Sequence, residues 1–279
     1  MTRLAFLPFP LACSGDRVPI ARLITAIGAG TIKPVSALGS FVYFVGVSVR
    51  RIVVPPVKTR LLFRQLEFVG NRSLGIIVIS SAMVGSVFGL ILGDIFRTFG
   101  AESMLGAASG IALSKELAPV FAGFLVTARA GSAMAAEIAT MRVNEQIDAM
   151  RVMAVNPYGY LVAPRILAGV LMLPLLTVIF ILTGVFMSFV IGVSFFDIDV
   201  GTFFEKLRWM VKPRYIVQGM EKGAVFGAIL SSIGCYKGFY AAGGAKGVGR
   251  ATTEAVVYSL VAILVSDYFL SYLQFDKTI

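Results

Sequence analysis

Residues 115–157 read KELAPVFAGFLVTARAGSAMAAEIATMRVNEQIDAMRVMAVNP, and the rest of the chain is organised around them. The stretch begins as an apolar helix that carries charge, becomes rich in small residues, and ends in the polar segment RVNEQIDAMRVM. We predict that this segment forms a short helix over residues 141–154. Because a turn of a few residues would suffice to join two membrane spans, a charged helix at this place predicts a contact surface outside the membrane.

The composition indicates an all-α, polytopic membrane protein. Of the 279 residues, 57% are hydrophobic and only 14% are charged, and the mean hydropathy is +0.87. A soluble domain would have about a quarter of its residues charged. Several apolar runs approach or exceed the roughly 20 residues that cross a bilayer core as a helix. No stretch remains for a nucleotide-hydrolysing domain, so the expected energy source is a partner protein or a gradient.

Five transmembrane helices are predicted from the apolar runs. They cover residues 73–96, 103–139, 158–194, 215–240 and 251–274. The second is too long for one straight crossing and must tilt or project beyond the bilayer, and Pro119 is expected to kink it. We therefore divide the chain into an N-terminal tail with interfacial helices, 1–72, and a five-helix transmembrane domain, 73–279.

Two further amphipathic helices are expected beside the spans. In TRLLFRQLEF, leucine and phenylalanine alternate with Arg60, Arg64 and Glu67, a pattern typical of a helix that lies in the membrane interface with its basic face toward the headgroups. Residues 196–212 hold the only tryptophan and are expected to form a loop helix on the outer side.

The distribution of Lys and Arg predicts the orientation. If the N-terminus, the polar helix and the loop 237–250 share one side of the membrane, most of the 25 Lys and Arg residues fall on that side. By the positive-inside rule this side is cytoplasmic. The formal charge of +10 then reflects membrane topology, and nucleic acid is not an expected partner.

Several kinds of site chemistry are excluded by the sequence. The chain has no His and only two cysteines, Cys13 and Cys235, so neither a metal centre nor a disulfide framework is expected. GGAKGVGR does not match a phosphate-binding loop, because Lys246 is followed by Gly247. We expect a flexible basic loop there, no catalytic residues anywhere, and an uncleaved cytoplasmic tail in the first fifteen residues.

Four ionisable residues are predicted to lie well inside the spans: Lys115, Glu116, Lys222 and Asp267. A charge at mid-bilayer costs at least about 2.5–3.5 kcal/mol on insertion scales, so such residues usually face a bundle interior or an aqueous cavity. The four charges sum to zero, so the residues can pair to hold helices together. They can also line a pathway that receives a charged headgroup, and the two roles are compatible.

Two other patterns mark the second span and the polar helix. ARAGSAMAAE, residues 128–137, places small residues three and four apart, which favours close helix packing. Its Arg129 and Glu137 are interpreted as snorkelling and interface-pairing residues. In the polar helix, charged residues recur at three-residue spacing beside an apolar ridge. The charged stripe is Arg142, Glu145, Asp148 and Arg151, and the ridge is Ile147, Met150 and Met153.

Four motifs carry a family resemblance: KELAPV, ARAGSAMAAEIATMRVNEQIDAMRVMAVNP, PRILAGVLMLPLLT and GVGRATTEAVV. Together they resemble the MlaE/YrbE permeases, the membrane subunits of ABC transporters that work with MCE-domain proteins, over residues 60–275. The resemblance implies a homodimer, cytoplasmic ATPase subunits that use ATP and Mg, an MCE protein on the outer side, and in some members a small cytoplasmic regulatory subunit. It implies transport of lipids, typically phospholipids, between the inner membrane and the outer envelope.

The resemblance also implies roles for single residues. The ATPase-coupling positions are Arg142, Glu145, Gln146, Asp148 and Arg151. The lipid-pathway positions are Lys115, Glu116, Lys222 and Asp267, with Lys115 standing where the family often has Arg. The expected location is a bacterial inner membrane, with the plastid inner envelope as an alternative. A gradient-driven secondary transporter and a non-transporting scaffold are the rival functions, and no cofactor is expected in this chain.

Overall fold

The computed structural model describes residues 36, 38–52 and 59–276, with side chains as far as Gln274. The chain forms two compact units, residues 1–44 and 45–279, and the second holds every feature discussed below. The tail expected over residues 1–15, with Cys13, lies outside the described residues. Within the described part of the chain the structure is helices and short turns without a strand, which confirms the all-α fold.

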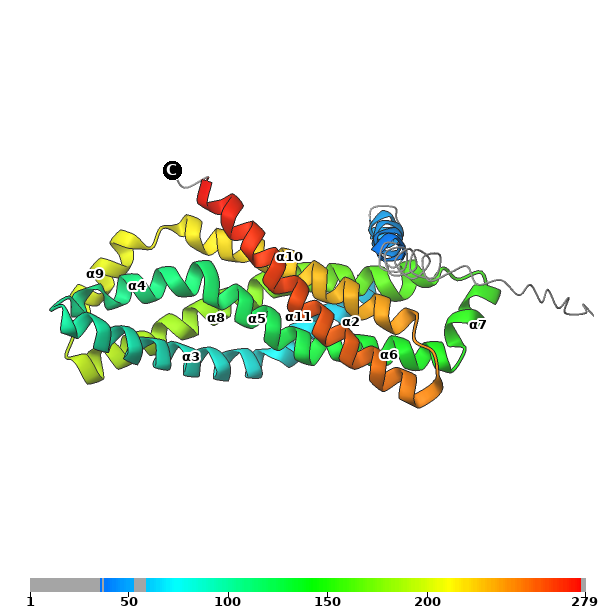
Figure 1. Cartoon of the computed structure of the whole chain (residues 1–279), viewed down its shortest axis with the longest axis horizontal. Coiled ribbons are helices and arrows are strands. Elements are labelled where there is room, and N and C mark those ends of the chain that lie inside the picture. The colour runs from blue at the N-terminus through cyan, green and yellow to red at the C-terminus, as the bar shows by residue number, and fades with distance from the viewer. Residues whose placement is uncertain (1–35, 37, 53–58, 277–279) are drawn as a thin grey trace, which may run out of the picture. The chain divides into compact units, whose positions relative to one another are not determined.

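The second unit is a bundle of long helices (Figure 1). Its elements are α2 (Thr59–Val69), α3 (Asn71–Thr98), η1 (Glu102–Met104), α4 (Leu105–Ala112), η2 (Leu113–Leu117), α5 (Ala118–Val126), η3 (Thr127–Gly131), α6 (Ser132–Val143), α7 (Gln146–Val152), η4 (Tyr158–Val162), α8 (Ala163–Phe196), α9 (Val200–Met210), α10 (Pro213–Phe239) and α11 (Gly244–Asp276). Among the described residues, four helical runs are long and apolar enough to cross a membrane: Thr59–Thr98, Glu102–Val143, Tyr158–Phe196 and Gly244–Gln274.

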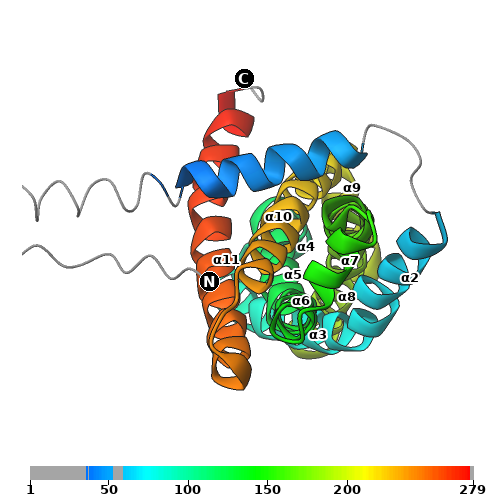
Figure 2. The same ribbon diagram turned by 90° about the vertical axis from the view of Figure 1, so that its right-hand side faces the viewer.

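The predicted fourth span is present as α10, but its composition does not mark it as a span. It carries Glu221, Lys222 and Lys237 among many glycines and serines. In Figure 2, which looks onto the end of the bundle that bears α7, α10 runs between α8 and α11. A helix surrounded mainly by protein needs less apolar surface than one that faces lipid. The polytopic helical fold is thus confirmed, while the count of five spans remains a prediction.

Small residues bring the backbones of the central helices together. A Cβ atom on Gly85 of α3 would collide with the backbone of Gly184 in α8, and one on Gly227 of α10 would collide with that of Gly169. The small residues of ARAGSAMAAE have the same use, because Ala135 lies against Gly238 of α10. Close approach at small residues is how helices associate where lipid removes the hydrophobic driving force.

The second span is interrupted by two π-helical segments, η2 and η3. Pro119 lies in the first turn of α5, directly after η2. Proline lacks an N–H group and clashes with the carbonyl four residues before it, and a π-helical turn removes that conflict. The disturbance expected at Pro119 therefore takes the form of a π-helical segment, and it includes Lys115 and Glu116. Such segments are frequent at functional sites.

The predicted polar helix over 141–154 is wrong in its bounds. Helix α6 continues to Val143, and α7 covers only Gln146–Val152. Glu145, between them, has a φ of 57°, a left-handed conformation that no residue adopts inside a right-handed helix. Arg142 and the residues after Glu145 consequently belong to different helices, so their three-residue spacing does not define one face.

Two other predicted boundaries also change. The expected loop 237–250 is largely helical, because α10 continues to Phe239 and α11 begins at Gly244. The turn itself needs only Gly243 and Gly244, whose φ angles are 96° and 65°. The loop helix expected over residues 196–212 is the shorter helix α9, Val200–Met210. Asp199, directly before it, caps the helix by accepting a hydrogen bond from the backbone N–H of Thr202.

The amphipathic helix expected before the first span is confirmed as α2. Its Leu62, Leu66 and Phe68 pack against the bundle core, while Phe63 is 68% exposed. The position of this helix in a membrane interface remains a prediction.

Candidate functional site

The ammonium group of Lys222 is the centre of an ion cluster inside the bundle. Its side chain is fully buried, and Nζ lies 2.6 Å from Glu116 Oε2 and 2.9 Å from Asp267 Oδ1. Nζ also donates to Ser271 Oγ at 2.7 Å. An ammonium group has three donors, and these three acceptors use all of them. Helices α10 and α11 and the π-helical segment η2 are joined at this one atom.

Ser271 is the member of the cluster that sequence reasoning missed. Its hydroxyl lies 3.2 Å from each oxygen of the Glu116 carboxylate and 2.8 Å from the carbonyl oxygen of Asp267. The available signal was its spacing, because a residue four positions after Asp267 lies on the same face of the helix. Ser271 thus contacts both the Glu116 carboxylate and the Lys222 ammonium group.

The cluster carries two carboxylates and one ammonium group, so it has a net charge of −1 when all three are ionised. The Asp267 side chain is 20% exposed and that of Glu116 is 47% exposed, whereas Lys222 is 0% exposed. Lys222 follows Pro213 by nine positions, about 13 Å along α10 at 1.5 Å per residue. The lysine of the cluster is therefore inaccessible, whereas the glutamate is accessible. The distance from Pro213 also places the cluster well away from the end of α10.

Lys115 does not join this cluster. Its ammonium group lies 4.9 Å from the ring centroid of Tyr215, a cation–π distance, and no ion pair to it occurs among the described residues. Neighbouring residues on a helix point about 100° apart, so when Glu116 faces Lys222, Lys115 faces elsewhere. Three of the four predicted intramembrane charges thus meet, and a role for any of them in lipid passage remains a proposal.

The polar residues around α7 form a compact corner at one end of the bundle. Asp148 accepts from Arg142 at 2.8 Å and from Arg151 at 3.1 Å, which links the end of α6 to α7. Ile147 is fully buried and anchors the helix. Glu145 and Gln146 are exposed, and Val152 and Met153 are 89% and 66% exposed. The helix presents charged and apolar surface together.

Arg129 and Glu137 lie on the second span but do not meet. Arg129 donates to the carbonyl oxygen of Phe68 at 2.6 Å and to Ser73 Oγ at 3.1 Å. Glu137 accepts from Arg165 at 2.8 Å, and the Arg165 side chain is only 6% exposed. Each residue therefore connects the second span to a different helix. Glu137 pairs with Arg165, which the sequence had not singled out, and the location of this pair at a membrane interface remains a prediction.

Comparison with known proteins gives the family. The Permease MlaE family model matches residues 62–273. A probable ABC transporter permease protein of Rickettsia felis is 39% identical over 256 residues, which is 92% of this chain and 99% of that protein. A probable ABC transporter permease protein of Synechocystis is 40% identical over 222 residues, or 80% of this chain and 84% of that protein.

A plant protein is similar as well. The chloroplastic protein Trigalactosyldiacylglycerol 1 of Arabidopsis thaliana is 39% identical over 226 residues, covering 81% of this chain and 65% of that protein. The family match covers most of each candidate span among the described residues and all residues of the ion cluster, and the helical membrane fold agrees with it. The chain therefore belongs to the MlaE family of ABC transporter permeases.

Proposed function

We propose that this permease moves lipids, in the first place phospholipids, between the inner membrane and the outer envelope. The observation that carries the proposal is the half-exposed Glu116 carboxylate on a fully buried Lys222. A charged group inside a membrane bundle is costly and usually faces the bundle interior or an aqueous cavity, where it pairs. Lys222 is paired, and the half-exposed Glu116 leaves the cluster accessible to a charged headgroup. The printed name of the Arabidopsis relative contains that of a lipid, trigalactosyldiacylglycerol, which supports a lipid cargo.

The power source is a separate ATPase that binds ATP and Mg. ABC transporter permeases act with such subunits, and α7 offers the surface on which one can dock. Asp148 fixes the angle between α6 and α7 through Arg142 and Arg151, so a push on α7 is passed to the second span, which contains Glu116. Glu145 and Gln146, both exposed, complete the proposed coupling surface.

The remaining partners follow from the family. The functional unit is a homodimer with an MCE-domain protein on the outer side and, in some systems, a small regulatory subunit in the cytoplasm, where the N-terminus also lies. An almost continuous row of large apolar residues on helix α11 is exposed, and such a surface suits contact with a second copy of the chain or with lipid. These are Val257, Tyr258, Val261, Leu264, Val265, Tyr268, Phe269, Tyr272 and Leu273.

Affinity purification from native membranes tests the proposal. The full-length chain, solubilised in mild detergent, is expected to retain an ATPase subunit, an MCE-domain protein and phospholipid, all identified by mass spectrometry. A permease recovered without an ATPase, under conditions that keep other ABC complexes intact, would contradict it. Transport in liposomes that needs an ion gradient and no ATP would replace it with a secondary transporter.

A further inference from the structure

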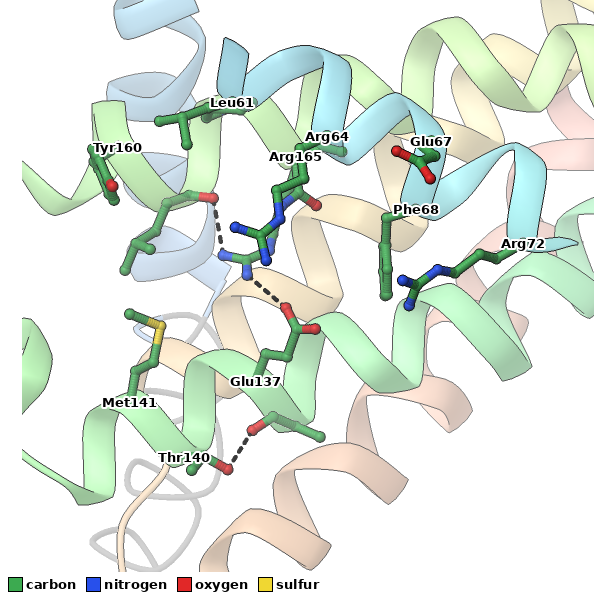
Figure 3. Close-up of a pocket in the computed structure, with 14 residues that line it drawn as sticks. Leu61, Arg64, Glu67, Phe68, Arg72, Glu137, Thr140, Met141, Tyr160 and Arg165 are labelled. Atoms are coloured by element: carbon green, nitrogen blue, oxygen red, sulfur yellow. Dashed lines mark hydrogen bonds and ion pairs between the residues drawn. The ribbon is translucent and has the colours of Figure 1, made fainter. Parts of the chain in front are cut away.

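A cavity of about 670 Å³ lies apart from the Lys222 cluster, between α2, the start of α3, α6 and the start of the third span. Drug-sized and lipid-sized groups occupy protein cavities of roughly 300–1,000 Å³. Figure 3 shows that Arg64 on α2 and Arg165 at the start of α8 extend into the same part of this cavity as Glu137. Arg72 and Glu67 also line it.

The lining of the cavity carries more positive than negative charge. Three arginines and two glutamates line it, and the one ion pair among them in the described residues joins Arg165 to Glu137. Arg64 and Arg72 have no ion-pair partner within that part of the chain. Arg129 adds a further positive charge nearby, because its guanidinium and that of Arg72 lie 5.0 and 5.9 Å from the centroid of the Phe68 ring, which lines the cavity.

Arg165 supplies the buried polar group that points to a ligand. The residue is 5% exposed, and its guanidinium donates to Glu137 and to the carbonyl oxygen of Leu161. Its Nε has no hydrogen-bond partner within the described residues. A buried guanidinium has five donors and is costly when some are unused. The Oε1 atom of Gln65, another lining residue, is likewise buried without a partner. Polar atoms without a described partner thus lie in the wall of the cavity, beside the space that a polar ligand would fill.

The position of the cavity indicates where such a ligand comes from. Arg72 is the second residue of α3, Glu137 and Thr140 are close to the end of α6, and Tyr160 and Arg165 are near the start of the third span. The cavity therefore lies where the predicted first three spans begin or end, and our inference places this level at the headgroups of a bilayer. Its wall also contains apolar side chains, those of Leu61, Phe68, Met141 and Leu161, so it suits an amphiphile better than a free ion.

We infer that this cavity binds the phosphate-bearing headgroup of a membrane phospholipid, with Arg64, Arg72 and Arg165 as the phosphate ligands and the apolar wall against the start of the acyl chains. Arginine is well matched to phosphate because its planar fork can donate two hydrogen bonds at once. None of the residues of the Lys222 cluster lines this cavity, so the inference does not depend on the role of that cluster in transport.

The test measures lipid binding to the full-length chain in mild detergent by native mass spectrometry. The probes are phosphatidylglycerol and monogalactosyldiacylglycerol with the same acyl chains, of which only the first carries phosphate. We expect phosphatidylglycerol to bind at least about tenfold more tightly, since charge-assisted hydrogen bonds are lost with the phosphate. The double variant Arg64→Gln, Arg72→Gln should lose about tenfold in phosphatidylglycerol affinity, and both residues are exposed enough that folding is expected to survive.

Two further variants sharpen the result. Arg60→Gln removes the same charge from the same helix at an exposed residue that does not line the cavity, and it should bind like the wild type. Glu137→Gln keeps an acceptor for Arg165 but removes the competing negative charge, so it should bind phosphatidylglycerol more tightly. Asp94→Asn, at an exposed acid of α3 that does not line the cavity, should leave this binding unchanged.

Four outcomes would overturn the inference. Equal affinity for the two lipids would remove the phosphate from the recognition. Equal losses in Arg60→Gln and the double variant would show general attraction to a basic surface. Displacement of the lipid by millimolar inorganic phosphate would assign the site to the free ion. Unchanged lipid binding in the double variant, together with release of the ATPase subunit, would assign the cavity to protein docking.

Discussion

Lys222 and Glu116 are 106 residues apart in the sequence, and their side chains form an ion pair of 2.6 Å inside the helical bundle. Asp267, another 45 residues beyond Lys222, completes the arrangement. Lys222 is fully buried, whereas Glu116 and Asp267 are partly exposed, so a ligand could reach the two acids but not the lysine. The first predictions ask whether this arrangement serves only to hold helices together.

Lys222→Met is expected to destabilise the protein strongly. The substitution leaves Glu116 and Asp267 close together without a counter-charge, and removing one partner of a buried ion pair costs about 3–5 kcal/mol. Thermal unfolding of the full-length chain in detergent would measure the effect.

A triple variant separates stability from function. Lys222→Met combined with Glu116→Gln and Asp267→Asn removes all three charges, and such replacements by uncharged groups are often neutral for stability. We expect the triple variant to recover most of the stability lost in Lys222→Met but not transport. Recovery of both would show that the cluster is a structural link only.

Asp148→Arg should weaken association with the ATPase. The change breaks the links from Asp148 to Arg142 and Arg151 and puts three arginines at the corner between α6 and α7. The pairs are partly exposed, so stability should fall by no more than about 1 kcal/mol, while the amount of ATPase recovered with the permease should fall severalfold or more.

The matched control is Glu205→Arg, which makes the same charge change at an exposed residue of α9. It should keep the ATPase bound. Equal recovery of the ATPase with Asp148→Arg and with the wild type, accompanied by normal transport, would count against α7 as the docking surface.

Gly227→Ala should destabilise the bundle although alanine is the better helix former. Its Cβ would collide with the Gly169 backbone of α8, and such overpacking typically costs about 1–3 kcal/mol. Gly75→Ala is the control, because a Cβ there meets no atom within 4 Å. At that position the change should be neutral or stabilising, by up to about 1 kcal/mol. If the melting temperatures of both variants rise together, α8 and α10 are not in the close contact described here.

The membrane fold was predictable because apolar runs of this length have few alternatives, and α3, the long second and third runs and α11 all fall where such runs occur. Positions within a span were harder. Glu145 breaks the polar helix with a positive φ, and a glutamate gives no local signal for that conformation. Gly-rich sequence after residue 243 was interpreted as a loop, yet it starts α11. Gly247 is needed there for another reason, because a Cβ atom would collide with the backbone of Ala242.

The candidate site was predictable in composition but not in pairing. Ionisable residues are conspicuous within apolar runs of sequence, so Glu116, Lys222 and Asp267 were predicted as site residues. The partners of these residues depend on how each helix is rotated about its axis. That rotation places Glu116 against Lys222 and places Lys115 over the ring of Tyr215. Arg165 escaped notice because it stands near the end of a span, where a snorkelling arginine is ordinary; its burial against Glu137 is visible only in three dimensions.

Lipid transfer by the reconstituted transporter with Asp267→Asn tests the central claim most directly. This substitution keeps the Lys222–Glu116 pair, so the permease should fold, unfold at nearly the wild-type temperature and retain its ATPase. Asp94→Asn, at an exposed acid of α3, serves as the control. Our account predicts that ATP-driven phospholipid transfer falls at least about tenfold in Asp267→Asn and is unchanged in Asp94→Asn. Wild-type transfer by a normally folded Asp267→Asn permease would contradict it.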